Sequence, residues 1–285
     1  MTSQLVAMDN ISSTEQSDRT IKAPVRSRQM IAGKSFLTQL AVVLAALVVW
    51  QLFSYTGTAV KAGLPSPIDS FVRLFELVVT GTYWVALGST MFSWLSAFLL
   101  SLGVGIPVGM ALGRSRRGAD SSKFMIDFLR TIPSLAIIPL ALLLFGPTYT
   151  MVILTAWFTA VWPVLLQAMY AAEHADPVLA RVAKSFRLTF KDRVRYVLAP
   201  EFLAFFWPGI RMAVTASLLV VVGAELIGGA PGLGRAIQDA LLVNQQPSMF
   251  AYVLTAAFTG LGINAVLTLL QRKLLWWHPS MRKDR

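Results

Sequence analysis

Residues 84–112 read WVALGSTMFSWLSAFLLSLGVGIPVGMAL, a stretch of 29 positions without one charged side chain. A helix needs about 20 consecutive, mostly apolar residues to cross the hydrocarbon core of a bilayer. The whole chain has the same character, since hydrophobic residues make up 55% of its 285 positions and charged residues only 14%. The sequence therefore predicts an all-α integral membrane protein.

Five further apolar stretches surround this one, at residues 36–55, 124–145, 149–170, 202–227 and 249–270. Together the stretches predict six transmembrane helices. Only a Gly-Pro-Thr turn at residues 146–148 separates the third stretch from the fourth, so we expect these two spans to form an antiparallel hairpin. The segment 65–79 instead shows apolar side chains at helical spacing with charged ones between them, which is typical of a helix on the membrane surface.

The distribution of basic residues predicts how these spans are oriented. If six spans alternate across the membrane, one side receives five Lys and Arg in the N-terminal segment, four in the loop 113–123, six in the loop 171–201 and five after residue 270, out of 25 in the chain. Cytoplasmic segments are enriched in Lys and Arg. We therefore expect both termini in the cytoplasm, with a disordered cytoplasmic tail at 1–33, a transmembrane domain at 34–274 and a second cytoplasmic tail at 275–285.

Composition argues against several classes of function. A net charge of +11 and a pI near 10.3 are compatible with nucleic-acid binding, but the basic residues lie in the short polar segments between spans, where orientation requires them. The chain has no cysteine, which excludes disulfides and cysteine-ligated metals, and its two histidines lack the spacing of a metal site. A membrane-embedded enzyme would need a cluster of His, Asp or Glu at one membrane face, and the acids are scattered.

Two glycine-containing segments imitate nucleotide-binding motifs without matching them. Residues 32–35 read AGKS, like the end of a phosphate-binding loop, but the first glycine of that motif would fall on Arg28 and a membrane span follows. The glycine cluster at 228–234 lies between two spans with no βαβ unit around it, so it is no dinucleotide fingerprint. We interpret it as an extracytoplasmic turn that ends the fifth span, and we expect no ATP hydrolysis by this chain itself.

Small residues and prolines occur inside the spans. Gly105, Gly109 and Gly113 form two consecutive GxxxG steps on one face of the second span, so we expect a close helix contact there. Spacing alone leaves two options open, a contact within the subunit, which we favour, and one across a dimer. Pro133 and Pro139 lie inside the third span, where each frees backbone carbonyls. They either line a wet central pathway or are tolerated in a tilted helix.

Glu225 is an acid within the apolar run LLVVVGAELIGGA. Intramembrane acids are costly, which makes this residue a candidate for a gate or an interhelix hydrogen bond in the pathway. It also lies only a few residues from the outer loop, so an interfacial carboxylate is an equal alternative. Asp127 and Arg130, three positions apart near the cytoplasmic end of the third span, are expected to pair along one helical face.

The loop 176–200 between the fourth and fifth spans is basic and amphipathic. Asp176-Pro177 is typical of a helix start, and apolar positions at helical spacing follow beside basic ones. The pattern breaks near residues 188–189 and resumes toward Pro200. We expect two short helices parallel to the membrane, which dock a cytoplasmic partner. An amphipathic surface helix that binds anionic lipid is an alternative interpretation.

Four stretches carry a family likeness: LRTIPSLAIIPLALLLFG at 129–146, PGIR at 208–211, Ala224-Glu225, and PGLG at 231–234. With the six expected spans, they resemble the permease subunits of type I ABC importers, close to the branch for nitrate, sulfonate, taurine and bicarbonate. The resemblance covers nearly everything after about residue 36.

That family carries a cytoplasmic motif of Glu-Ala-Ala, three residues, a glycine and, some nine residues later, Leu-Pro. Counting back from Pro200 places residues 181–183 at Glu-Ala-Ala and Arg187 at the glycine, so only Ala183 and Pro200 are kept. Glycine lets the chain turn between the two coupling helices, whereas Arg187 makes a positive φ costly. Either the turn is made differently or this subunit docks differently.

The resemblance implies a division of labour among several proteins. Two permease chains form the pathway, an extracytoplasmic solute-binding protein delivers the solute, and two separate ATP-binding subunits dock on the cytoplasmic coupling helices between spans four and five. The coupling residues are then Arg181, Ala183, Lys184, Arg187 and Pro200. ATP and Mg bind the partner ATPase, and this chain holds no cofactor. The location implied is the cell inner membrane, with lipid as a further partner.

The resemblance also implies import of a small anion such as nitrate, a sulfonate, taurine or bicarbonate. The degenerate motif raises the case for a heterodimer of two unlike permeases, although we favour a homodimer. The alternative function is an ion-gradient-driven secondary transporter. Such a protein would show internal repeats or coupling-ion acids near the midplane, and neither is evident.

Overall fold

The structure, a computed structural model, describes residues 28–61, 63–174 and 177–276. Every regular element in these ranges is helical, as the sequence predicts. The chain divides into two units, Met1–Phe53 and Ser54–Arg285, and each is described by itself. Of the two predicted tails, residues 1–27 and 277–285 lie outside the described ranges.

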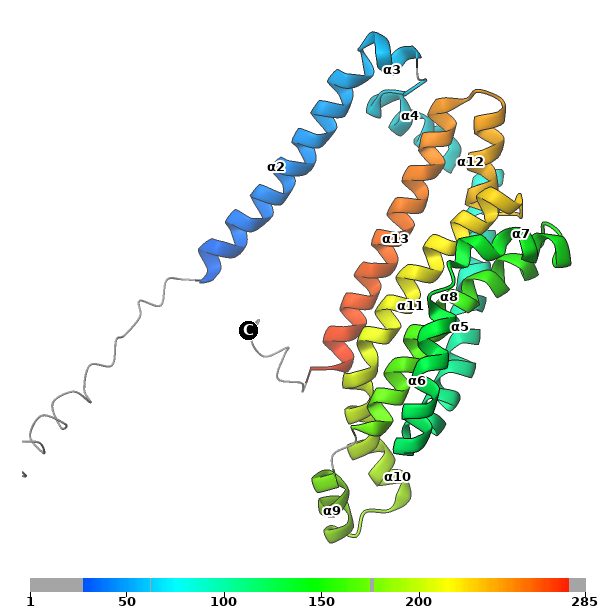
Figure 1. Ribbon diagram of the computed structural model, residues 1–285. Coiled ribbons are helices and arrows are strands. Elements are labelled where there is room, and N and C mark those ends of the chain that lie inside the picture. Colours follow the sequence, from blue (N-terminus) through cyan, green and yellow to red (C-terminus); the bar gives the residue numbers. More distant parts are fainter. Residues whose placement is uncertain (1–27, 62, 175–176, 277–285) are drawn as a thin grey trace, which may run out of the picture. The chain divides into compact units, whose positions relative to one another are not determined.

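The first unit contains the long helix α2 (Arg28–Ser54), drawn in blue in Figure 1. Its 27 residues correspond to about 40 Å of helix. The helix begins inside the segment 1–33 that we expected to be disordered. The reason is local, because Arg, Gln and Met at positions 28–30 have high helix propensity and no proline interrupts the residues that follow.

Three long helices form the core of the second unit, α5 (Gly81–Gly113), α8 (Tyr149–Glu173) and α11 (Ala199–Gly228). They run side by side in Figure 1. α8 is the central one. Half of its most apolar 18-residue segment is buried, compared with 22% of that segment in α5 and 39% in the helical stretch that contains α11. Its buried face consists of small or branched side chains four residues apart, Val152, Ala156, Ala160, Val164 and Ala168. Such a row lets neighbouring helices pack closely.

α13 (Gln246–Leu274) lies at the edge of this core, and only 6% of its most apolar 18-residue segment is buried. Most of its apolar surface is therefore available to lipid or to another chain. α13 packs along α11 and, at its N-terminal end, against α12 (Leu233–Leu242) and α4 (Pro67–Val78).

The third predicted span, 124–145, is broken in the structure, at the first of the two prolines that we noted inside it. α6 (Arg116–Arg130) and α7 (Ser134–Phe145) meet at a 76° bend. Pro133 explains the break, because it has no N–H to donate and it disfavours helical geometry in the residue before it. α7 has 12 residues, about 18 Å of helix, and does not cross a bilayer core alone. It still packs against α8 after the turn at Gly146, whose φ is 66°.

Two elements flank the start of the second unit, the short α3 (Gly57–Lys61) and the predicted amphipathic helix α4 (Pro67–Val78). The Ser66 hydroxyl caps α4 by accepting a 3.0 Å hydrogen bond from the Asp69 N–H. One face of α4 buries Ser70, Leu74 and Leu77. The helix that the sequence predicts is thus present, and it is held against α13.

The segment between the fifth and sixth spans contains a helix where the sequence predicts only a turn. α12 (Leu233–Leu242) follows the left-handed turn at Gly229, which ends α11 with a φ of 65°. Its buried residues are Leu233, Gly234, Ile237 and Ala240. This is helical spacing, but it extends over only ten residues beside a glycine cluster, so the signal was weak.

The cytoplasmic loop of the sequence analysis forms three further elements, α9 (Pro177–Ser185), α10 (Phe190–Arg193) and a π-helical turn, η1 (Val194–Leu198). In the described residues, four helical segments are long and apolar enough to cross a membrane, and the bent pair α6–α7 would make a fifth. The remaining predicted span corresponds to α2, whose apolar part is Thr38–Ser54.

Candidate functional site

The basic coupling loop forms a compact turn at one end of the second unit (Figure 1). The Leu188 N–H donates to the Ala183 carbonyl at 3.1 Å and the Arg187 N–H donates to the Lys184 carbonyl at 3.0 Å. These two bonds form the Schellman motif that ends many helices. The motif requires a left-handed residue, and Arg187 takes this position with a φ of 49°.

This geometry answers the question raised by Arg187. The turn is made with the same positive φ that glycine would allow, although arginine occupies the position. A left-handed conformation costs an L-residue about 1–2 kcal/mol. The strain is therefore local to the residue that departs from the family motif.

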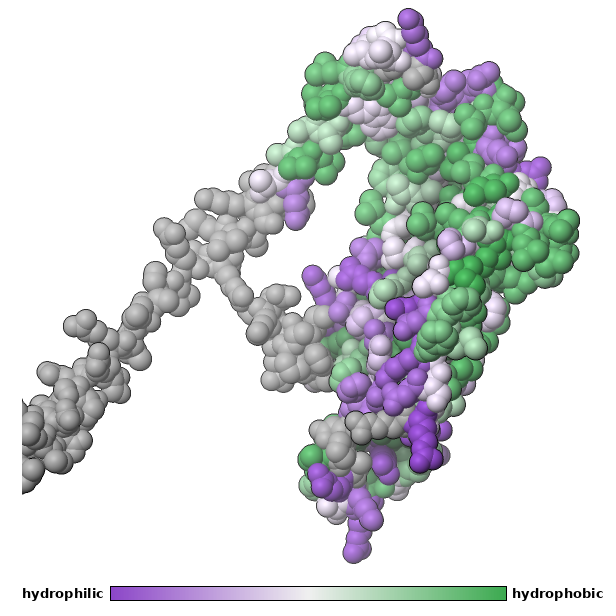
Figure 2. Space-filling model, viewed as in Figure 1, coloured by the Kyte–Doolittle hydropathy of each residue, from purple (hydrophilic) through white to green (hydrophobic). Residues whose placement is uncertain are grey.

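The coupling residues divide into an outer and an inner set. Arg181, Lys184 and Arg187 are exposed, whereas Ala183 is only 2% exposed. Figure 2 shows hydrophilic side chains at the end formed by α9 and α10, in contrast to the hydrophobic surface over α7. The basic groups can therefore reach a partner, while Ala183 packs inside the turn.

The second half of the loop differs from the expected separate helix parallel to the membrane. α10 and η1 run without interruption into α11, so this half is an extension of the fifth span. Pro200 accounts for the π turn, because it cannot donate to the carbonyl of Tyr196. The Ala199 N–H instead bonds to the Val194 carbonyl, five residues back. A cavity of about 300 Å³ lies beside this turn, between Leu179 of α9 and Phe205 of α11.

The three glycines of α5 face α8 within the same chain. A β-carbon at Gly109 would overlap the Leu165 carbonyl oxygen, and one at Gly113 would overlap that of Met169. At Gly105 it would come within 2.6 Å of the Val164 side chain. The close approach of α5 to α8 therefore depends on the absence of side chains at these positions.

Glu225 forms an interhelix hydrogen-bond network in which its side chain is fully buried. Its Oε2 accepts a 2.8 Å bond from the Thr90 hydroxyl of α5 and a 3.0 Å bond from the Gly234 N–H of α12. The Thr90 hydroxyl also accepts a 2.8 Å bond from the Leu233 N–H. The carboxylate thus caps the N-terminus of α12, where backbone N–H groups and the helix dipole favour negative charge.

This network joins two motifs that the sequence presented separately, Ala224-Glu225 and the PGLG segment at 231–234. A β-carbon at Gly232 would overlap the Glu225 carboxyl group, so the carboxylate occupies the space that this glycine leaves. Thr90 was not identified from the sequence, because a threonine inside an apolar span gives no signal of its own. Of the two alternatives for Glu225, the geometry is that of an interhelix hydrogen bond.

Pro133 and Pro139 occupy different places in the broken span. Pro133 is the residue that precedes α7 at the bend, and Pro139 lies inside α7. Beside the bend is a cavity of about 370 Å³ between α6, α7, α8 and α11. Arg130 lines this cavity, and its Nε forms an ion pair with Asp127 Oδ1 at 3.0 Å, which confirms the predicted pair. Nothing in the spacing of these two residues indicates that the pair borders a cavity.

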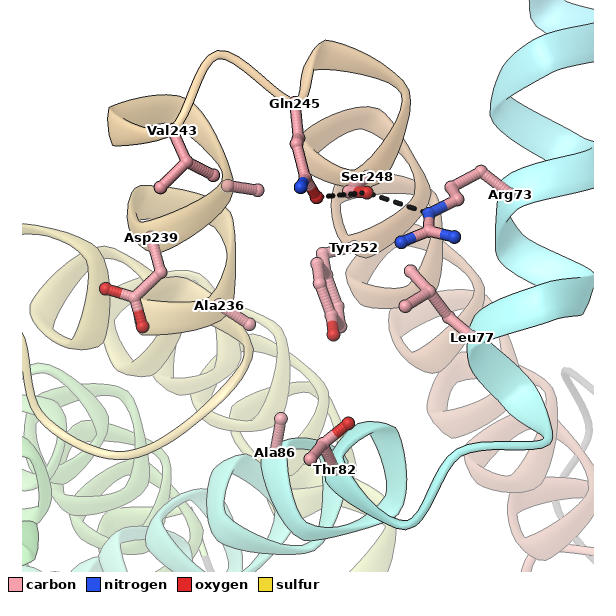
Figure 3. A pocket seen from close by; sticks show the side chains of 11 residues that line it. Arg73, Leu77, Thr82, Ala86, Ala236, Asp239, Val243, Gln245, Ser248 and Tyr252 are labelled. Atoms are coloured by element: carbon pink, nitrogen blue, oxygen red, sulfur yellow. Dashed lines mark hydrogen bonds between the residues drawn. The ribbon is translucent and has the colours of Figure 1, made fainter.

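A third cavity, of about 400 Å³, lies at the end of the unit opposite α9 (Figures 1 and 3). Arg73 of α4 lines one side and Asp239 of α12 the other. Arg73 Nε donates to the Ser248 hydroxyl at 2.9 Å, and that hydroxyl donates to the Gln245 side-chain oxygen at 3.2 Å. These bonds fix α4 to the start of α13.

Comparison with known proteins places these features in context. Residues 102–275 match the family described as "Binding-protein-dependent transport system inner membrane component". The putative aliphatic sulfonates transport permease protein SsuC of Bacillus subtilis is 30% identical over 82% of this chain and 85% of its own length. The bicarbonate transport system permease protein CmpB of Synechococcus elongatus is 28% identical over 87% of this chain and 92% of its own.

Two further similarities extend this result. The nitrate import permease protein NrtB of Synechococcus elongatus is 26% identical over 80% of this chain and 85% of its own length. Among solved structures, an inward-facing form of the MetNI methionine ABC transporter matches with a TM-score of 0.53 over 70% of this chain and 96% of the matched chain. Its sequence identity is 19%, so it supports the fold alone.

Proposed function

Because the chain belongs to the family of binding-protein-dependent transport system inner membrane components, we propose that it carries a small oxyanion into the cell. The chain is a multi-pass permease subunit without its own ATPase site, and ATP hydrolysis takes place on a partner subunit. The similar permeases are named for sulfonates, bicarbonate and nitrate. Each of these solutes presents negatively charged oxygen atoms, and taurine belongs to the same class. Their shared chemistry supports an oxyanion as the solute here.

The topology that we propose has six spans and places both termini in the cytoplasm of a cell whose inner membrane holds the protein. The spans are α2, α5, the broken pair α6–α7, α8, α11 and α13. The basic loops support this orientation, since α9 and α10 carry their exposed Lys and Arg at one end of the second unit. The cavity in Figure 3 then opens to the outside, where a solute-binding protein docks.

The observation that carries the importer mechanism is the turn at Arg187. A motif that lacks its family glycine nevertheless takes the backbone geometry that glycine suits. This supports docking of an ATP-binding subunit on α9, with Arg181, Lys184 and Arg187 as the exposed contacts and with Ala183 and Pro200 shaping the segment. ATP and Mg bind on that partner, and two permease chains, which we take to be identical, enclose the pathway.

The mechanism that follows is alternating access. Closure of the two ATP-binding subunits moves their coupling segments, and the continuous helix from α10 through η1 to α11 carries this motion into the membrane. ATP drives the switch by binding one conformation more tightly than the other. The π turn before Pro200 is the point where this helix is least regular, and it is suited to absorb part of the motion.

The test is to isolate the chain from its own membranes in mild detergent, identify its partners and assay ATP hydrolysis. We expect the isolated complex to contain an ATP-hydrolysing subunit, and we expect this subunit to be lost when residues 181–195 are scrambled. We also expect the complex to contain a single kind of permease chain. Two unlike permeases in the complex would replace the homodimer by a heterodimer. A preparation without any ATPase would favour the ion-gradient-driven secondary transporter.

A further inference from the structure

The cavity beside the bend of the third span has the size and the chemistry of a ligand site. Its volume of about 370 Å³ lies within the range of roughly 300–1,000 Å³ that is typical of small-molecule sites. Four helices contribute to its wall, and the lining residues that carry hydrogen-bonding groups are Arg130, Ser134, Thr159, Trp162, Gln167 and Tyr170. None of the described lining residues carries a carboxylate.

Among the residues that the structure describes, Arg130 is the one charged residue that lines this cavity. Its position is about 10 Å along α6 from Lys123, so it lies beyond the polar first half of that helix. The ion pair with Asp127 uses Nε, and a guanidinium has five N–H donors. The two Nη groups are therefore available for a second acceptor, while Asp127, which is not among the described lining residues, pairs with Nε on the exposed side of Arg130.

The bend adds a second source of positive potential. Ser134 is the first residue of α7 and lines the cavity. The first N–H groups of a helix have no partner within it and form the positive end of the helix dipole. In membrane transporters, the N-termini of broken helices are suited to face anionic groups for this reason. The 76° bend thus brings a helix N-terminus and a guanidinium to one cavity.

The part of the wall formed by α8 supplies neutral donors. Gln167 contributes an amide and Tyr170 a hydroxyl. A β-carbon at Gly209 of α11 would come within 2.6 Å of Gln167 Cγ, so the PGIR segment leaves room for this side chain. The Trp162 indole N–H is buried and has no acceptor among the described residues, so an anion that reached it would satisfy a buried donor.

We propose that this cavity is a binding subsite for a small oxyanion on the permeation pathway, with Arg130 as the anion-binding residue and Asp127 as its positioning residue. The ligand class is a singly charged group with two or three oxygen atoms on one centre, as in nitrate, bicarbonate or a sulfonate. Such a group matches the planar fork of a guanidinium. The inference rests on the proposed function, because it assigns the solute of that importer to a site.

The first test measures uptake of nitrate, bicarbonate and methanesulfonate by the complete importer in proteoliposomes. Arg130→Gln is expected to lower uptake at limiting substrate about tenfold or more, because hydrogen bonds to a charged group are among the stronger ones. ATP hydrolysis stimulated by the binding protein should persist. Arg211→Gln is the matched control, since Arg211 is an exposed arginine of α11 that donates to Asn264 at 3.0 Å and does not line the cavity. It should keep uptake within about twofold.

The second test does not depend on turnover. The chain has no cysteine, so Ser134→Cys introduces its only thiol. In the purified complex, we measure how fast this thiol reacts with an anionic and with a cationic methanethiosulfonate. We expect the ratio of the anionic to the cationic rate to be higher at position 134 than for a thiol placed at Thr215, which lies outside the cavity lining. Arg130→Gln should abolish this preference, and the transported oxyanion should slow the reaction.

The outcomes separate the subsite from the function on which it rests. If the wild-type complex transports none of the three anions, the proposed substrate class is wrong, and with it the subsite. If it transports one of them but Arg130→Gln leaves uptake unchanged, the subsite alone is wrong. If Arg130→Gln fails to assemble, the thiol reactivity at position 134 is the deciding measurement. It is then made on Ser134→Cys alone and on Ser134→Cys combined with Arg130→Lys. Equal reactivity toward both reagents, without protection by the anion, then overturns the proposal.

Discussion

Replacement of Thr90 by valine tests the buried network that joins α5, α11 and α12. Valine has nearly the same shape but lacks the hydroxyl, which donates to Glu225 at 2.8 Å and accepts from the Leu233 N–H at 2.8 Å. A hydrogen bond to a charged group contributes about 1.5–3 kcal/mol, and a buried N–H left without a partner costs about 1–3 kcal/mol. We expect Thr90→Val to destabilise the folded protein by about 3–5 kcal/mol.

Thr155→Val is the matched control. Thr155 is also buried, but its hydroxyl donates only to the Met151 carbonyl of its own helix, at 2.8 Å. Removal of this bond leaves no group unpaired, so we expect a cost of about 1 kcal/mol or less.

The assay is the half-life of the purified complex at a fixed elevated temperature, because membrane proteins often unfold irreversibly. A loss of about 3 kcal/mol shortens the half-life on the order of 100-fold if the network is broken in the rate-limiting step. Thr155→Val should shorten it severalfold at most. Equal half-lives for the two variants would refute the assignment of Thr90 as the bridge.

Three further variants test other parts of the structure. Arg187→Gly should stabilise the turn after α9 by about 0.5–1 kcal/mol, because removal of the backbone strain at a left-handed arginine outweighs the added freedom of the unfolded chain. Faster amide exchange at Leu188 in this variant would contradict the prediction. Gly109→Ala should destabilise the α5–α8 contact by about 1–3 kcal/mol, measured by thermal inactivation. Gly88→Ala is its control, because a β-carbon at Gly88 has no atom within 4 Å and the substitution should be neutral or stabilising. Ala183→Glu should uncouple ATP hydrolysis from uptake, because it places a charge at a position that is only 2% exposed. Normal uptake by this variant would contradict the docking of the ATP-binding subunit on α9.

The sequence predicted the long spans and the coupling loop because their signals are local. An apolar run of 20 or more residues has few alternatives to a membrane helix. The break between α9 and α10 was also predicted, since the apolar pattern stops near residues 188–189. The cost of a positive φ at Arg187 was identified as well, but the sequence left open whether the chain accepts it.

The features that were missed depend on contacts between distant residues or on context. Thr90 and Glu225 are 135 positions apart, so neither signals the other. Pro133 was noted as a possible irregularity, but prolines occur in intact membrane helices and the extent of the 76° bend depends on how α6 and α7 pack on α8. The cavity beside Arg130 forms only when four helices are assembled, so its polar residues looked unrelated along the chain.

The central claim is tested most directly by uptake into proteoliposomes that contain the permease, its ATP-binding subunit and its solute-binding protein, with ion gradients collapsed by ionophores. The account predicts that labelled nitrate, bicarbonate or a sulfonate accumulates only when ATP is present on the side of α9, and that uptake stops when residues 181–195 are scrambled. Accumulation that follows an imposed ion gradient and ignores ATP would contradict it and would identify a secondary transporter.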